Sequence, residues 1–230
     1  ICTPFDENSV NLIKELKFDC VKIGSCSFTD WPLLNKIAST LQGMPVIAST
    51  AGATLEEISN VLSFFKHREF TIVLMHCVGE YPTPRQNYQL NQLDLLKTFG
   101  VPVGLSTHEE PAEIDSVGIA VAKGIRIFEK HVALVTNKHN RNAYSATPEE
   151  IRIWLSQMLK AREMCGVSEG RSVSSQKEMA DLRQFKRGVF ASADLEPGQT
   201  TRNVYLAWPS IPGQLVANDL SKYLEIKVLK

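Results

Sequence analysis

Residues 1–165 alternate between short β-rich runs and segments with helical periodicity, and this alternation constrains the fold more than any other feature. Residues 72–75 form a continuous apolar run, as expected of a strand buried on both faces of a parallel sheet. Repeated β-then-α units predict a parallel α/β fold. We expect strands at residues 20–24, 45–50, 70–77, 101–107 and 125–134, and helices at residues 8–17, 32–41, 55–66, 90–99, 112–122 and 148–165.

Polar residues after successive strands help to choose between a doubly wound sheet and a barrel. No GxGxxG or GxxxxGK[ST] motif follows a predicted strand, which weakens the nucleotide-binding doubly wound alternative. A ring of chemically capable side chains at strand ends is how a barrel builds its active site. Because about five βα units are visible, the sequence predicts an incomplete (β/α)₈ TIM barrel. The polar residues in question are Lys22, Ser25, Ser49, Thr50, His76, Ser106, His108, Glu129, Lys130 and His131.

The composition of the chain changes after the predicted barrel. Residues 1–168 are expected to form the barrel part, and residues 169–185 a linker that begins in a stretch rich in Gly and Ser. Residues 186–230 show short strand-like runs and a turn at residues 196–198, without β/α alternation. We therefore expect a second, small and mostly β module.

The charge and cysteine content exclude several classes of protein. The 25 Lys and Arg residues balance the 25 Asp and Glu residues, which argues against a nucleic-acid partner bound through bulk charge. No apolar run approaches the roughly 20 residues that span a bilayer, so no membrane partner is expected. The five cysteines form no CxxC pair, which favours reduced thiols. The chain opens at Ile1 without a signal peptide, and a cytoplasmic location is expected.

Several segments, taken together and in this order, resemble the sialic acid synthase family. They read CVKIGSCSFTDWPLL at residues 20–34, IASTAG at 47–52, MHCVGEYPTP at 75–84 and EKH at 129–131. The resemblance runs from Thr3 to about Ala217 and implies a (β/α)₈ barrel followed by a small antifreeze-like (SAF) domain. It also implies a metal-dependent condensation of phosphoenolpyruvate with an N-acetylated amino sugar, which gives a nine-carbon sialic acid and phosphate.

The same resemblance implies that this chain is cut at both ends. Three further βα units would precede Thr3, and the SAF module would continue beyond Lys230. It further implies a divalent metal, Mn²⁺ or Mg²⁺, and a homodimer with exchanged SAF domains in the full-length protein.

Site residues carry over position by position from the resemblance. The chemistry agrees, because a trianionic substrate needs a cation and several hydroxyl donors, and a lysine inside an apolar strand is unusual without an anionic partner. Two histidines at neighbouring strand ends can converge on a metal, although two histidines bonded at loop bases would be a structural alternative. The expected roles are phosphoenolpyruvate binding for Thr3, Lys22, Ser25, Ser49 and Ser106, substrate-pocket contacts for Phe5 and Tyr81, and metal binding for His108 and His131. Tyr81 could equally brace the Pro-rich loop beside it, and His76 is expected to pack or hydrogen-bond rather than bind ligand.

Departures from the family pattern fall mostly on the sugar side. Gly79 replaces the usual Asn or Ser, and Thr107 replaces an Asp beside the metal His. Arg141 or Asn142 occupies the position of a sugar-binding Asp, and residues around Trp208 lack the Arg that a partner subunit usually supplies. The acceptor sugar is therefore expected to differ from N-acetylmannosamine or to be held differently.

Two alternatives remain open at the level of sequence. A Schiff-base aldolase could use Lys22 or Lys130 as its amine. A degenerate barrel could instead bind sugar or phosphoenolpyruvate without catalysis, or the SAF module could act as an interaction domain.

Overall fold

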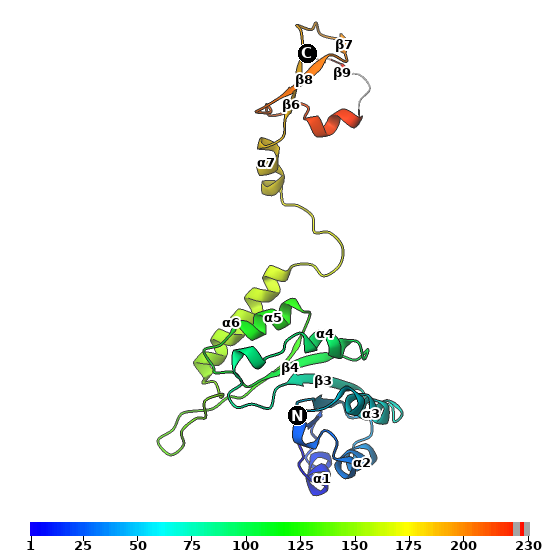
Figure 1. The fold of residues 1–230 in the computed structure, drawn as a ribbon, viewed down its shortest axis with the longest axis vertical. Coiled ribbons are helices and arrows are strands. Elements are labelled where there is room, and N and C mark those ends of the chain that lie inside the picture. Colours follow the sequence, from blue (N-terminus) through cyan, green and yellow to red (C-terminus); the bar gives the residue numbers. More distant parts are fainter. Residues whose placement is uncertain (223–225, 228–230) are drawn as a thin grey trace. The chain divides into compact units, whose positions relative to one another are not determined.

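A computed structural model describes residues 1–222 and 226–227 of the chain, which divides into two compact units (Figure 1). The first unit comprises Ile1–Gly166 and the second Val167–Lys230. Among the described residues, no helix is both long enough and apolar enough to cross a bilayer.

The first unit is built on a five-stranded sheet in which every neighbouring pair is parallel. The strands follow the chain in order, so each must be connected to the next by a crossover, and a helix lies in each crossover. This arrangement confirms the predicted parallel α/β architecture and corresponds to part of a barrel. The strands are β1 (Val21–Ile23), β2 (Val46–Ser49), β3 (Ile72–Cys77), β4 (Val103–Thr107) and β5 (Ile127–Lys130).

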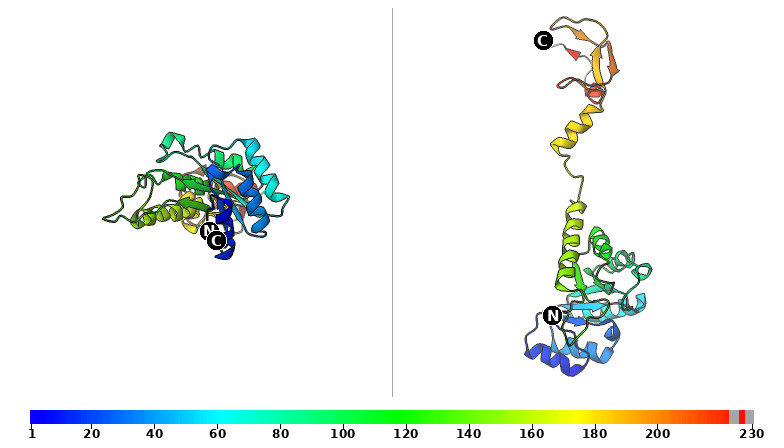
Figure 2. Two further views of the ribbon diagram at one scale, coloured as in Figure 1. Left: turned by 90° about the horizontal axis from the view of Figure 1, so that it is seen from below. Right: turned by 90° about the vertical axis from the view of Figure 1, so that its left-hand side faces the viewer.

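Six helices in the described part of this unit accompany the strands, and Figure 2 shows them from two further directions. They are α1 (Glu7–Glu15), α2 (Trp31–Thr40), α3 (Leu55–Lys66), α4 (Gln92–Lys97), α5 (Asp115–Ala122) and α6 (Pro148–Cys165). Helices α3 and α6 have the predicted bounds, and each begins with a capping box, Thr54 with Glu57 and Thr147 with Glu150.

Other helices and strands are shorter than predicted. Helix α4 begins only after Gln89, whose φ of 47° interrupts helical geometry. Strand β5 stops at Lys130 rather than extending to residue 134, and beyond it only Val132 forms an isolated bridge, to Ala146. A strand continues only where a neighbouring strand supplies hydrogen-bond partners for its backbone. Because β4 ends at Thr107, which pairs with Lys130, β5 ends there too.

The second unit contains two antiparallel strand pairs, β6 (Gly188–Ala191) with β8 (Val204–Ala207) and β7 (Thr200–Thr201) with β9 (Ile226–Lys227). A turn at residues 196–198 is present, with Gln199 N–H donating to Glu196 C=O at 3.0 Å. The short strands agree with the sequence, but the unit also contains helical segments at Gln176–Gln184 and Ala217–Lys222. The assignment as a SAF domain stays a prediction. Residues 223–225 and 228–230, which belong to the predicted end of this module, lie outside the described residues.

The predicted linker differs from the structure, because helix α7 (Gln176–Gln184) occupies much of residues 169–185. Its start is fixed locally, since the Ser175 hydroxyl accepts a hydrogen bond from Glu178 N–H at 3.0 Å. This capping serine directly follows a Gly- and Ser-rich stretch, whose composition by itself predicts irregular backbone.

Alternate residues of the strands divide the sheet into two faces. Val21, Val46, Ile72 and Val103 are buried in a core shared with the helices. On the other face of β4, Gly104 leaves room for the side chain of Met75 from β3. A Cβ atom added at Gly104 would lie 2.3 Å from Met75 Sδ and 2.8 Å from the Ile127 carbonyl oxygen.

We predict that Gly104→Ala destabilises the protein by about 1–3 kcal/mol, the usual cost of overpacking a core. The control is Gly118→Ala in α5, where the new methyl would meet the flexible end of Gln157 at 3.3 Å and helix propensity favours alanine. Denaturant unfolding of both variants measures the difference. Equal midpoints for the two would show that the close approach at Gly104 relaxes without cost.

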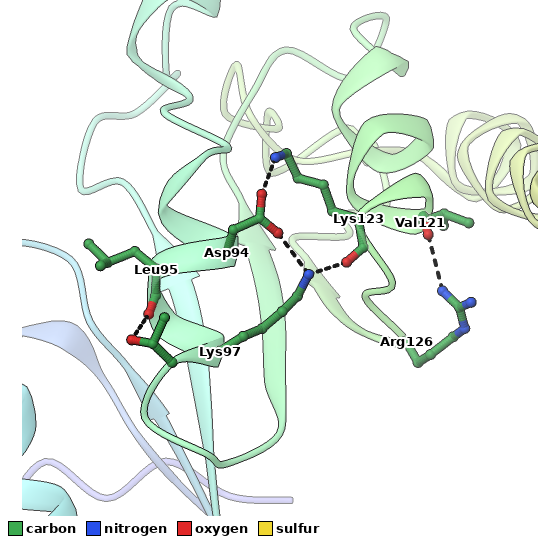
Figure 3. Close-up of polar contacts among 7 residues, drawn as sticks. Asp94, Leu95, Lys97, Val121, Lys123 and Arg126 are labelled. Atoms are coloured by element: carbon green, nitrogen blue, oxygen red, sulfur yellow. Dashed lines mark hydrogen bonds and ion pairs between the residues drawn. The ribbon is translucent and has the colours of Figure 1, made fainter. Parts of the chain in front are cut away.

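Asp94 joins the ends of α4 and α5 (Figure 3). Its carboxylate accepts hydrogen bonds from Lys123 Nζ and, at 2.8 Å, from Lys97 Nζ, which also donates to the Lys123 carbonyl oxygen. Nearby, Arg126 Nη1 donates to the Val121 carbonyl oxygen at 3.2 Å. The hydrogen bond from Lys123, followed by that from Lys97, lowers the pKa of Asp94 below its ordinary value of 3.8.

Because the folded-state pKa is lowered, the ionised Asp94 stabilises the fold at neutral pH, and this contribution is lost as the pH falls through that pKa. Asp94→Asn is therefore expected to lower the unfolding midpoint at about pH 7 and to differ less from the parent protein near pH 3. The difference in unfolding midpoint between Asp94→Asn and the parent protein should also shrink in about 1 M salt, which screens exposed ion pairs. A difference in midpoint that stays constant across pH would contradict an electrostatic origin of the stabilisation by Asp94.

Candidate active site

A hollow of about 490 Å³ opens at the carboxyl ends of the strands. Cys2 forms an isolated parallel β-bridge with Val21 of β1, and this backbone pairing brings the N-terminal segment to the same rim. All nine predicted site residues line this hollow: Thr3, Phe5, Lys22, Ser25, Ser49, Tyr81, Ser106, His108 and His131. Its remaining lining residues are Gly24, Cys26, Cys77, Glu129 and Lys130.

Strand alternation explains why these side chains meet. Ser106 and His108 are two residues apart, so both project to the same face of the sheet. Ser106 pairs in register with Glu129 of β5, and Thr107 pairs with Lys130. Ser106, Glu129 and the two histidines beyond them therefore lie on one face, toward the hollow.

Glu129 lies at the centre of the charged part of the hollow. Its Oε1 atom accepts a hydrogen bond from Ser106 Oγ at 2.8 Å and lies 3.4 Å from Lys22 Nζ. The sequence placed Glu129 in the EKH motif but gave it no role at the site. The structure shows that it orients two predicted ligand-binding groups, Lys22 and Ser106.

Ser49 provides a buried hydroxyl that suits a polar ligand. It lines the hollow and is 1% exposed, yet its Oγ atom has no hydrogen-bond partner among the described residues. An unpaired buried hydroxyl is costly, and an anionic ligand would satisfy it. The neighbouring Ser25 Oγ accepts a hydrogen bond from Ala51 N–H at 3.2 Å.

The two predicted metal-binding histidines lie side by side, with ring centroids 5.2 Å apart. His108 Nδ1 lies 2.9 Å from the Val78 carbonyl oxygen and donates to it, which leaves Nε2 as the ligand nitrogen. Burial lowers the pKa of both imidazoles below the ordinary 6.5, which favours the neutral form that metals bind.

These histidines fit a divalent metal with two protein ligands and open positions. Among the described residues there is no cluster of three or more His, Cys, Asp or Glu side chains that could hold a metal. A closed structural site is therefore not formed by this part of the chain, whereas an open site shared with substrate suits the pair.

An aromatic cluster surrounds the histidines. The ring of Tyr81 lies 4.3 Å from that of His108, and the ring of Tyr144 lies 5.0 Å from His131 and 5.1 Å from Tyr81. The sequence did not single out Tyr144, because its contacts depend on how the loop at residues 131–146 returns to the sheet. Ala146 N–H donates to the His131 carbonyl oxygen at 2.9 Å and holds that loop in place.

Two other side chains of the first unit make contacts away from the hollow. His76 points away from it, with Nε2 donating to the Tyr88 carbonyl oxygen at 2.8 Å, as expected from the sequence. Arg141 forms an ion pair with Glu150 at the start of α6 and does not line the hollow. Trp208, in the second unit, donates from its indole to the Phe185 carbonyl oxygen at 3.0 Å.

Lys130 and Glu109 form a buried ion pair beside the histidines. Both side chains are 2% exposed, and Lys130 Nζ lies 3.1 Å from Glu109 Oε1. The pair links the end of β5 to the residue that follows His108. Each charge therefore depends on the other, because an unpaired buried charge is strongly destabilising.

We predict that Glu109→Gln lowers the free energy of unfolding by about 3–5 kcal/mol, since it leaves the Lys130 ammonium buried without a counter-charge. Glu149→Gln is the matched control, because its exposed pair with Arg152 should contribute less than about 1 kcal/mol. Denaturant unfolding of both variants checks the prediction. Similar losses in the two would mean that the Lys130–Glu109 pair is effectively solvated.

The fold and this site define a class of protein, an α/β barrel-type chain that gathers a lysine, several hydroxyls and two imidazoles at the carboxyl ends of parallel strands. The NeuB family model matches residues 1–170. The chain belongs to this family, that of the sialic acid synthases, as the sequence motifs predicted.

Solved structures and curated relatives agree with this assignment. A crystal structure from Chromobacterium violaceum, described as a spore coat polysaccharide biosynthesis protein E, is 46% identical with a TM-score of 0.87, and the match covers 98% of this chain and 68% of that one. The N-acetylneuraminic acid synthetase of Leptospira borgpetersenii is 31% identical with a TM-score of 0.70, over 79% and 63% of the two chains. The N,N'-diacetyllegionaminic acid synthase of Campylobacter jejuni is 32% identical over 86% of this chain and 59% of its own length.

This chain spans only part of such proteins. The matches to eight curated relatives cover 40–65% of the relatives' lengths.

Proposed function

We propose that this chain forms part of a synthase that condenses phosphoenolpyruvate with an N-acetylated amino sugar, giving a nine-carbon sialic acid-type product and phosphate. The observation that carries the proposal is the single hollow lined by all nine residues expected from the motifs. Membership of the NeuB family supports the same reaction class.

Lys22, Ser49 and Ser106 bind the phosphate and carboxylate of phosphoenolpyruvate, together with Thr3 and Ser25. Lys22 supplies the cation, and the unpaired Ser49 hydroxyl supplies a buried donor. Binding of this anion competes with Glu129 for Lys22 and Ser106, so the substrate takes hydrogen bonds that the protein otherwise makes to itself.

His108 and His131 hold a divalent metal, Mn²⁺ or Mg²⁺. When bound, such a metal supplies a Lewis acid that polarises the aldehyde of the open-chain sugar. The hydrogen bond from His108 Nδ1 to Val78 fixes the tautomer that such a site requires, and the rings of Tyr81 and Tyr144 pack against the imidazoles.

The acceptor sugar lies on the side of Tyr81 and Phe5, where this chain departs most from the family pattern. Arg141 is engaged with Glu150 and is not directed at a sugar in this hollow. We therefore propose an acceptor other than N-acetylmannosamine. We also propose that the full-length protein is a cytoplasmic homodimer in which the second unit contributes to the partner subunit.

The decisive experiment measures phosphate release from phosphoenolpyruvate by the full-length protein over a panel of amino sugars. Lys22→Met is expected to raise the KM for phosphoenolpyruvate and lower kcat/KM by at least about 100-fold, because it removes the only cation proposed for the phosphate. His108→Ala is expected to lose turnover yet still bind phosphoenolpyruvate in a calorimetric titration, and a chelator should abolish activity reversibly.

Two outcomes would contradict the proposal. Borohydride trapping of pyruvate on Lys22 or Lys130 would favour the Schiff-base aldolase, because the synthase reaction forms no imine. Phosphoenolpyruvate binding without phosphate release on any sugar would favour a non-catalytic binding barrel.

A further inference from the structure

A second hollow, of about 480 Å³, lies between the β2–α3 and β3–α4 connections. None of the nine residues assigned to phosphoenolpyruvate, sugar or metal lines it. Its volume falls within the range of small-molecule sites, roughly 300–1,000 Å³. It therefore requires an explanation that the proposed reaction centre does not supply.

The second hollow lies beside the first. Cys77, at the end of β3, lines both. A more open groove also joins them, because it shares Ser25 and Tyr81 with the first hollow and Gly79 and Asn87 with the second. The groove therefore borders both hollows on the surface of the protein.

The two hollows differ in charge. Lys22, Glu129 and Lys130 line the first, whereas among the described residues that line the second there is no Asp, Glu, Lys or Arg. His76 also lines the second, and burial lowers its pKa, which favours the neutral imidazole. The one carboxylate of the groove, Glu80, is held by Asn87 Nδ2 at 2.8 and 3.2 Å. The second hollow therefore suits an uncharged part of a ligand.

The lining of the second hollow combines amides with aliphatic side chains. Gln89 and Gln92 offer side-chain amides, which both donate and accept hydrogen bonds. Leu55, Ile58 and Leu95 offer apolar surface from helices α3 and α4. An acylamido group presents matching parts, since its amide is a donor and acceptor and its carbon chain is apolar.

Gly79 lies where the groove meets the second hollow. It lines both the groove and the second hollow, and a Cβ atom added there would meet only Ala51 Cβ, at 3.8 Å. Neither crowding nor a left-handed backbone requires glycine at this position, because its φ is not among the positive values. The consequence of glycine here is an open groove.

We propose that the second hollow is a subsite for the acyl arm on the amino nitrogen of the acceptor sugar, admitted past Gly79. This inference rests on the proposed function and names its substrate class, an N-acylated amino sugar whose uncharged acyl chain is longer than acetyl. Asn87, Gln89 and Gln92 bind the amide, and the leucines of α3 and α4 contact the chain.

The test is a calorimetric titration of the full-length protein, without phosphoenolpyruvate so that no turnover contributes heat. The ligands are the N-acetyl, N-butanoyl and N-hexanoyl forms of the amino sugar that releases most phosphate in the panel described above. The affinity is expected to rise about three- to four-fold for each added methylene, the value for burial of a CH₂ group. Gly79→Leu should abolish this rise. Gly79→Ala, the matched control, should behave as the parent protein.

A second blocking variant, Leu95→Trp, fills the hollow from α4 and should flatten the same series if Gly79→Leu folds poorly. An affinity independent of chain length in the parent protein, or a series unchanged in both blocking variants, would overturn the subsite. If the N-acetyl sugar binds and phosphate is released while the series is flat, only the subsite is wrong. If no sugar binds and no phosphate is released, the proposed function fails, and the subsite with it.

Discussion

The parallel register of β4 and β5 is the constraint on which the site depends. Ser106 is paired with Glu129, and the next alternate positions hold His108 and His131. Because strand side chains alternate between faces, a slip of one residue would turn these groups toward the helices and replace them with their neighbours. The hydrophobic core prevents this slip, since the other face of the same strands is buried against helices.

Packing beneath and beside the site holds this register. Gly104 lets Met75 lie directly under the hollow, and no larger residue fits there without displacement of a side chain or of the β5 backbone. The buried pair of Lys130 and Glu109 links the two strand ends that carry the histidines. The imidazoles are thus positioned by a close approach and an ion pair that do not themselves touch a substrate.

The site divides naturally by charge. Cationic, carboxylate and imidazole groups gather in the first hollow. The lining of the neighbouring second hollow contains no Asp, Glu, Lys or Arg among the described residues. Gly79 and Arg141, where the chain departs from the family pattern, do not line the first hollow, so the proposed acceptor subsite is separate from the charged groups.

The sequence by itself determined the parallel α/β architecture and the ends of α3 and α6. These features follow from hydrophobic periodicity and capping boxes. The predicted site residues came from the resemblance to the family, and the rule that parallel strands bring their carboxyl ends to one edge explains why those on the strands meet. Only the tertiary structure decided the contacts of Glu129, the packing of Tyr144 on the histidines and the diversion of Arg141 to Glu150. Each of these depends on a rotamer and a loop path selected among partners distant in space, and no sequence spacing encodes that choice.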